Sequence, residues 1–234
     1  MIATPRFVFL HLHKTGGQFV NRLLLRHVPD AHAVGYHLPR STAPPELRGL
    51  PVIGFVRNPW DWYVSWYAFN HAQPQRNPIF RAVSADGHLD FKHTLVNMLH
   101  LGCERSRALR TRIGAALPET RDGNLGSGIT RADMLGYADE TRGYFTWLWR
   151  YMFFLDARAD GLYAGRMENL RADLLAALRA VGQPVSAGLE HAILNNPQVN
   201  VSARRDYRSY YDAELRALVA ARDAELVAIY GYEF

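Results

Sequence analysis

Phe7-Val-Phe-Leu-His-Leu-His-Lys-Thr-Gly-Gly-Gln-Phe-Val20 changes its periodicity halfway along. The first part, Phe7–Leu12, is apolar and rich in residues that favour strands. From Gln18 to His27 the apolar residues recur at helical spacing. The two parts meet at Gly16-Gly17, where the chain can turn tightly. The stretch therefore predicts a strand, a short loop and a helix.

The same alternation recurs along the chain. Pro51–Val56 is a nearly all-apolar run, typical of a buried parallel strand. Further strands are expected over Ala31–Tyr36 and Leu162–Arg166, and further helices over Trp60–Asn70, Phe91–Leu101, Asn169–Val181, Ala187–Leu194 and from Asp212 to near Gly231. Strands that alternate with helices predict an α/β fold with a central, mainly parallel sheet and helices on both faces.

The composition indicates a soluble protein. The chain has 234 residues, 48% of them hydrophobic, which suits one α/β domain. No apolar run reaches the roughly 20 residues that cross a bilayer. The run Phe7–Leu12 is too short and too weakly flanked by basic residues for a signal peptide, so we expect none. Cys103 is the single cysteine, so it cannot form an internal disulfide. We therefore expect no membrane span and a reducing, cytoplasmic environment.

The positive charge is weak evidence for nucleic-acid binding. The formal net charge is +5, but the arginines are scattered and form no basic run. We therefore expect no nucleic-acid partner, and attribute part of the excess to an anionic ligand. Lys14 and Lys92 are the only lysines among the 27 basic residues. A lysine in such a chain is informative because it supplies a compact point charge that arginine cannot replace.

Lys14 lies in the loop His13-Lys-Thr-Gly-Gly-Gln18. Glycines let the backbone approach a ligand closely, and the following helix presents N–H groups and the positive end of its dipole. Lys14 adds an ammonium and Thr15 a hydroxyl. The loop therefore predicts a phosphate-binding site. It is not a Walker A loop, because Phe9 stands where the first glycine is required.

Four segments, in order, resemble motifs of the sulfotransferases that use 3′-phosphoadenosine 5′-phosphosulfate (PAPS). The loop at Lys14 resembles their 5′-phosphosulfate loop, and Gly54-Phe-Val-Arg-Asn-Pro-Trp-Asp-Trp-Tyr-Val-Ser-Trp-Tyr67 resembles their second motif. Gly165-Arg-Met-Glu-Asn-Leu170 resembles a later segment. Val199-Asn-Val-Ser-Ala203, with the closing Tyr230-Gly-Tyr-Glu-Phe234, is similar to the carbohydrate and bacterial branch.

The resemblance implies a sulfotransferase with PAPS as co-substrate, no metal, and a hydroxylated acceptor such as a carbohydrate or small-molecule alcohol. It implies a single P-loop-like, three-layer domain over residues 1–234, with residues 73–150 as a variable, largely helical insertion on the acceptor side. Arg57 and Ser65, eight positions apart, would hold the nucleotide 3′-phosphate. The residues it assigns to nucleotide binding are His13, Lys14, Thr15, Gly16, Gly17, Gln18, Phe19, Arg57, Ser65 and Arg204. Gln18 departs from the family, which has Thr or Ser there.

Sulfuryl transfer resembles phosphoryl transfer, so positioning and electrostatics should dominate catalysis. We assign Lys14 to the bridging oxygen of the leaving group, where negative charge develops. His37 follows the second expected strand and is the candidate general base, with His11 and His13 as rivals. Two alternatives stay open: a P-loop-type nucleotide or small-molecule kinase, and an inactive homologue that only binds PAPS. The acceptor and the oligomeric state do not follow from the sequence.

Overall fold

The computed structural model describes residues 1–121, 128–155, 160–197 and 204–234. The chain divides into two compact units whose segments alternate along the sequence. The first unit comprises Met1–Arg57, Asp122–Gly128 and Trp149–Val201, and the second comprises Asn58–Arg121, Ile129–Leu148 and Ser202–Phe234. The organisation as a single domain, with an acceptor-side insertion, stays a prediction.

The first unit is built on a five-stranded mixed sheet with the order β3-β1-β2-β4-β5. The strands are β1 (Ile2–Ala3), β2 (Val8–Phe9), β3 (His32–Ala33), β4 (Val52–Val56) and β5 (Leu162–Arg166). β4 pairs in parallel with β2 on one side and with β5 on the other. β1 pairs antiparallel with both β2 and β3. The parallel strands β2, β4 and β5 therefore end at a common edge.

The central strand β4 is buried along its whole length, as its apolar sequence predicts. Its side chains alternate between the two faces of the sheet. Phe55 packs into the core cluster formed with α1 (Gly17–His27), α8 (Leu170–Ala180) and α9 (Ala187–Asn195). Gly54 faces the other way, where a Cβ would lie 2.2 Å from the Phe153 ring, at the end of α7 (Tyr144–Phe153).

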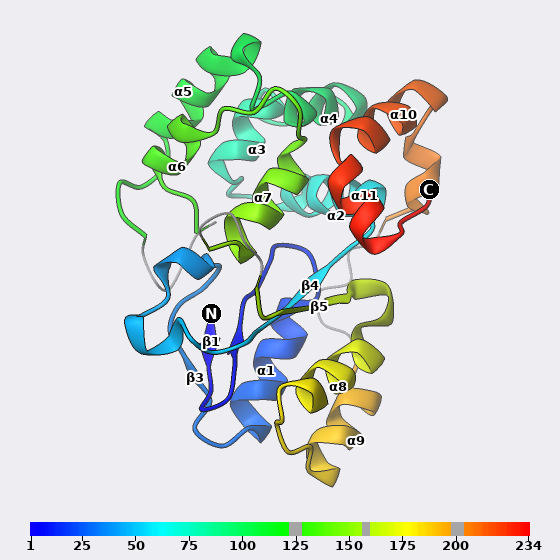
Figure 1. Ribbon diagram of the computed structural model, residues 1–234. Coiled ribbons are helices and arrows are strands. Elements are labelled where there is room, and N and C mark those ends of the chain that lie inside the picture. Colours follow the sequence, from blue (N-terminus) through cyan, green and yellow to red (C-terminus); the bar gives the residue numbers. More distant parts are fainter. Residues whose placement is uncertain (122–127, 156–159, 198–203) are drawn as a thin grey trace. The chain divides into compact units, whose positions relative to one another are not determined.

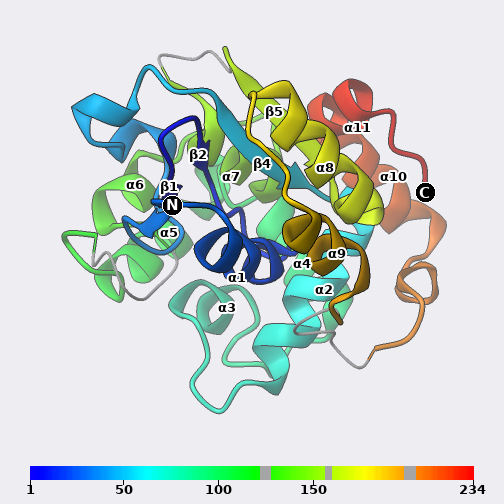
Figure 2. The same ribbon diagram turned by 90° about the horizontal axis from the view of Figure 1, so that it is seen from below.

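Both faces of the sheet are thus covered by helix. Figures 1 and 2 show α1, α8 and α9 side by side on one face. The core between them and the sheet includes Phe9, Val20, Leu174 and Ile193, each at most 1% exposed. The predicted α/β class, with a central sheet and helices on both faces, is confirmed.

The second unit is helical. Its elements are α2 (Pro59–Ala72), α3 (Pro78–Val83), α4 (Phe91–Leu99), α5 (Arg107–Ala115), α6 (Arg131–Gly136), the first half of α7, α10 (Ala213–Arg222) and α11 (Ala224–Tyr230). Asn58 caps α2, since its side chain accepts from the backbone N–H groups of Trp60 and Asp61. Asp212 caps α10 in the same way, through the N–H of Leu215.

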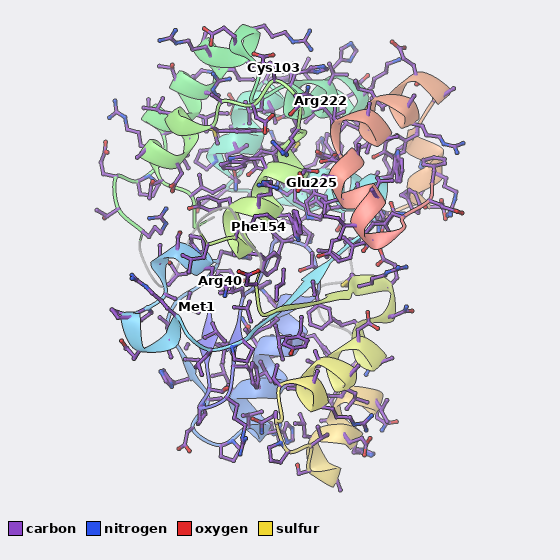
Figure 3. All side chains as sticks on the ribbon, in the orientation of Figure 1. Met1, Arg40, Cys103, Phe154, Arg222 and Glu225 are labelled. Atoms are coloured by element: carbon purple, nitrogen blue, oxygen red, sulfur yellow. The ribbon has the colours of Figure 1, made fainter. Side chains whose placement is uncertain are left out.

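A buried carboxylate lies at the centre of the second unit. Asp223, between α10 and α11, is fully buried and accepts from the Tyr63 hydroxyl at 2.8 Å and from Thr146 Oγ1 at 2.6 Å. Burial raises the pKa of Asp223 to about 6. The neighbouring Arg222 donates to the Leu99 carbonyl and to Cys103 Sγ. Figure 3 labels Arg222 and Cys103 close to each other.

Among the described residues, no helix combines the length and the apolar composition needed to cross a bilayer.

Candidate functional site

The loop between β2 and α1 has a strained backbone. Lys14 and Gly16 have φ angles of 60° and 79°, in the left-handed region. For Gly16 this conformation carries little strain, whereas for a lysine it is unfavourable. Gly17, the first residue of α1, lies against His11, because a Cβ there would come within 1.9 Å of that ring. The loop therefore holds the backbone tightly against the end of the sheet.

The N-terminus of α1 carries no acidic side chain. Gly16 occupies the N-cap position and, as a glycine, supplies no side-chain capping bond. The first turn also contains no acidic residue. The N-cap residue and the first turn therefore supply no carboxylate or hydroxyl to the positive end of the helix dipole. This arrangement favours a bound anion at the loop.

Arg57 adds a second cation to the loop from the adjacent strand. It follows β4, which ends beside β2, and its Nη1 donates to the Lys14 carbonyl at 3.0 Å. This contact fixes the guanidinium next to the left-handed residue. Parallel strands bring their carboxyl ends to one edge of the sheet, where ligands of open α/β sheets bind. Lys14 and Arg57, 43 residues apart, meet there as the sequence predicts.

The hydroxyl of Thr15 and the amide of Gln18 are engaged within the protein. Thr15 is 1% exposed, and its hydroxyl donates to the Leu12 carbonyl at 2.8 Å. Gln18 Nε2 donates to the Tyr36 hydroxyl at 3.1 Å. The Thr15 side chain therefore braces the loop from inside, while Gln18 joins the loop to the segment that carries His37.

Three histidines stack beside the loop. The rings of His13 and His37 are nearly parallel, with centroids 3.7 Å apart, and the His11 ring lies 4.3 Å from that of His37. His37 Nδ1 lies 2.7 Å from the His11 carbonyl oxygen, so this nitrogen carries the proton of the neutral ring. Nε2 is then the nitrogen that can accept a proton.

Burial keeps the His11 and His37 rings neutral. It lowers the pKa of His11 to about 3 and lowers that of His37 well below 6.5, with the neighbouring histidines adding to both shifts. Lys14 and Arg57 bring cationic side chains to the loop. Among the described residues, no group of three or more His, Cys, Asp or Glu side chains is placed to hold a metal ion.

A pocket of about 240 Å³ adjoins the loop within the first unit. It is lined by Phe19, Met167, Glu168, Asn169, Leu170, Arg171 and Ala172. Met167 and Leu170 also touch Gly16, since a Cβ on that glycine would lie 2.8 Å from each side chain. Arg171 covers the Phe19 ring at 5.1 Å. The pocket thus combines the Phe19 ring with apolar and polar side chains beside the loop.

The other two predicted site residues belong to the second unit. Ser65 is 3% exposed and lies in α2. Arg204 forms an ion pair with Asp61 in the first turn of the same helix. The structure therefore associates Arg204 and Ser65 with one helix. The motif at 199–203 lies outside the described residues.

No profile of a known protein family matches the chain, and no curated protein matches it in sequence. Solved structures that resemble it include the mouse sulfotransferase SULT7A1 complexed with PAP, which is 13% identical, with 99% of this chain and 90% of that chain covered and a TM-score of 0.49. A likeness at this level leaves function to be argued from the residues themselves.

Sequence reasoning missed two features of the site. The Gln18–Tyr36 contact and the Asp61–Arg204 pair join residues 18 and 143 positions apart. No motif or periodicity connects such residues, because tertiary packing alone brings them together. The stacking of His13 on His37 could have been predicted in part, because each histidine directly follows a strand that the sequence predicts.

Proposed function

We propose that this chain transfers the sulfuryl group of PAPS to a hydroxyl group of a carbohydrate or small-molecule acceptor. The observation that carries the proposal is the loop before α1. A helix N-terminus with glycine at its N-cap there meets Lys14 and Arg57, with no acidic residue in the first turn. Such a site favours a multiply anionic ligand.

The loop residues His13–Phe19 hold the 5′-phosphosulfate. Lys14 supplies the ammonium, and Thr15, Gly16, Gly17 and Gln18 contribute backbone N–H groups near the helix end. Phe19 borders the pocket beside the loop, which offers an apolar place for the nucleotide base. Arg57, Ser65 and Arg204 bind the 3′-phosphate, as the resemblance implies.

The reaction is an in-line displacement at sulfur. The acceptor oxygen forms a bond to sulfur while the bond from sulfur to the bridging oxygen breaks, and the nucleotide leaves with its 5′-phosphate. Lys14 Nζ stabilises the charge that develops on the bridging oxygen. His37 Nε2 takes the proton of the acceptor hydroxyl, because Nδ1 is held by the His11 carbonyl.

Calorimetry with 3′-phosphoadenosine 5′-phosphate (PAP) and adenosine 5′-phosphate tests the nucleotide assignment. We expect the bisphosphate to bind much more tightly. Arg57→Ala should weaken its binding roughly tenfold or more, because a hydrogen bond to a charged group contributes about 1.5–3 kcal/mol. Arg48→Ala is a matched control, since Arg48 Nε also donates to a backbone carbonyl, that of Ala43, at 3.0 Å. Equal affinities for the two nucleotides would contradict the proposal.

A screen of hydroxylated acceptors with labelled PAPS tests the activity. Transfer of label to a carbohydrate or alcohol is expected. Tight binding of the bisphosphate with no transfer to any acceptor would instead favour a protein that only binds the nucleotide.

A further inference from the structure

The ion pair between Asp61 and Arg204 is largely shielded from water. The Arg204 side chain is 15% exposed and the Asp61 side chain 17%, and Arg204 Nη2 donates to Asp61 Oδ1. By contrast, Arg208 and Asp206, in the same C-terminal segment, pair at 3.7 Å with exposed fractions of 55% and 65%. A shielded pair is screened less by salt than an exposed one, and removing one partner leaves a poorly solvated charge.

The segment that follows Arg204 is anchored on the same turn of α2. The Tyr211 hydroxyl donates to the Trp60 carbonyl at 2.8 Å, and Trp60 Nε1 donates to the Arg216 carbonyl at 3.0 Å. Asn58 Nδ2 donates to the Glu233 carbonyl at 2.7 Å. These hydrogen bonds attach the C-terminal segment to the start of α2. The ion pair with Asp61 orients the Arg204 side chain.

Asp61 lies four residues before Ser65 on α2. Residues with this spacing are neighbours on one face of a helix, with Cβ atoms about 5–6 Å apart. A phosphate that accepts a hydrogen bond from Ser65 would therefore approach a carboxylate. Like charges at this range disfavour binding unless a cation lies between them. Arg204, which pairs with Asp61, can supply that cation.

We propose that Asp61 is a positioning residue for the nucleotide 3′-phosphate, acting through Arg204. The carboxylate holds the guanidinium beside Ser65, and the guanidinium cancels the carboxylate's repulsion of the phosphate. This inference rests on the proposed function, because it assumes that Ser65 binds the 3′-phosphate. It adds that Arg204 contributes mainly by neutralising Asp61, and that the two residues act as one unit.

A double-mutant cycle on PAP affinity tests this unit. Arg204→Ala leaves the Asp61 carboxylate uncompensated and should weaken PAP binding about a hundredfold. Asp61→Asn loosens Arg204 but removes the repulsion, and should weaken binding about threefold at most. In the double variant both charges are gone, and we expect a loss of only about tenfold. The affinity lost in Arg204→Ala is thus largely restored by the second change, a coupling typical of contacting residues.

The readout is the ratio of affinities for PAP and adenosine 5′-phosphate, since a general structural defect would weaken both nucleotides together. Thermal unfolding of each variant checks folding. Arg208→Ala removes an arginine from the same segment, with an exposed partner, and should change the ratio less than twofold.

Two failures are distinguishable. Wild-type protein that binds both nucleotides equally overturns the proposed function and this inference with it. Wild-type protein that prefers PAP, with a double variant as weak as Arg204→Ala or weaker, overturns only the inference. Arg204 would then bind the phosphate independently of Asp61.

Discussion

Lys14 combines a required charge with an unfavourable backbone angle, and the two can be separated. Its φ of 60° suits glycine better than lysine. Lys14→Gly relieves this strain while the unfolded chain gains freedom, so we expect the unfolding free energy to stay within about 1 kcal/mol of wild type. Turnover should fall about a hundredfold or more, because the ammonium at the bridging oxygen is lost. Single-turnover rates and chemical denaturation measure the two effects.

Lys14→Arg should recover little of this turnover, because a planar guanidinium cannot replace a point charge in a loop this tight. Near-native turnover in Lys14→Gly would show that the ammonium does not stabilise the leaving group.

His37 has a φ of 52°, which asparagine also tolerates. His37→Asn can retain a donor for the His11 carbonyl but lacks the basic nitrogen Nε2. Nucleotide affinity should therefore stay nearly unchanged while turnover falls about a hundredfold. In the wild-type protein, turnover should persist to pH values well below 6.5, because burial lowers the pKa of His37.

The stacked neighbour His13 provides the comparison for this variant. If His13→Asn abolishes turnover and His37→Asn does not, the role of base passes to His13.

Asp223 makes stability depend on pH. Burial raises its pKa in the folded state from 3.8 to about 6, so folding favours the protonated carboxyl. Its stabilising contribution is complete below about pH 3.8 and is lost as the pH rises through about 6. The loss is on the order of 2–3 kcal/mol. Asp223→Asn should remove this part of the slope, which denaturation at pH 4.5 and pH 7 measures.

Other groups titrate over the same range, so the difference between wild type and variant is the relevant quantity. Asp206→Asn, at an exposed carboxylate, is the matched control substitution. Parallel slopes in wild type and Asp223→Asn would refute the prediction.

Two helix-start glycines differ in their surroundings. A Cβ on Gly17 would come within 1.9 Å of the His11 ring, whereas Gly188 in α9 has nothing within 4 Å. Gly17→Ala should destabilise the protein by about 1–3 kcal/mol, because the ring must move. Gly188→Ala should stabilise it by up to about 1 kcal/mol, since alanine favours the helix. Thermal unfolding of both variants checks the contrast, and equal shifts would contradict it.

The two five-residue strands were the easiest to predict. β4 and β5 lie where Pro51–Val56 and Leu162–Arg166 indicated, and β4 is buried along its whole length. The edge strand expected over Ala31–Tyr36 shrinks to His32–Ala33, and β1 was missed altogether. Two residues carry no periodic signal, and β1 exists because β2 and β3 pair with it on either side.

Helix ends were predictable where a side chain caps them. The helices expected from Trp60 and from Asp212 begin at Pro59 and Ala213, and Asn58 and Asp212 cap them. Asn169 occupies the N-cap position of α8, but its side chain makes no capping bond. The last helix, expected to run unbroken from Asp212, divides at Asp223 into α10 and α11. The division depends on tertiary contacts, because the Asp223 carboxylate accepts hydrogen bonds from the buried hydroxyls of Tyr63 and Thr146.

The whole protein should turn over without a divalent metal. Lys14 and Arg57 bring two cationic side chains to the loop, where they can neutralise the leaving group. We therefore expect excess EDTA to leave the rate of sulfuryl transfer unchanged. Turnover that is lost in EDTA and restored by magnesium would favour the kinase-type alternative.

The candidate site was predictable in part. The loop at Lys14 and its meeting with Arg57 followed from strand ends that share one edge of a sheet. The hydrogen bond from the Thr15 hydroxyl to the Leu12 carbonyl and the ion pair of Arg204 with Asp61 were not predictable. Each depends on which polar groups the tertiary packing brings close together.

The interleaving of the two units has a consequence for the order in which the chain is made. The Tyr63 hydroxyl binds the carboxylate of Asp223, which lies 160 residues later. At about 5–20 residues per second, a ribosome needs on the order of 10–30 s to travel between them. During that time the first unit, whose last segment ends at Val201, can be completed. Trp62 and Tyr63 are both fully buried in the finished protein. Until Asp223 has been made, the hydrogen-bond partner of Tyr63 is missing. These aromatic side chains therefore cannot reach their finished packing until Asp223 has been added to the chain.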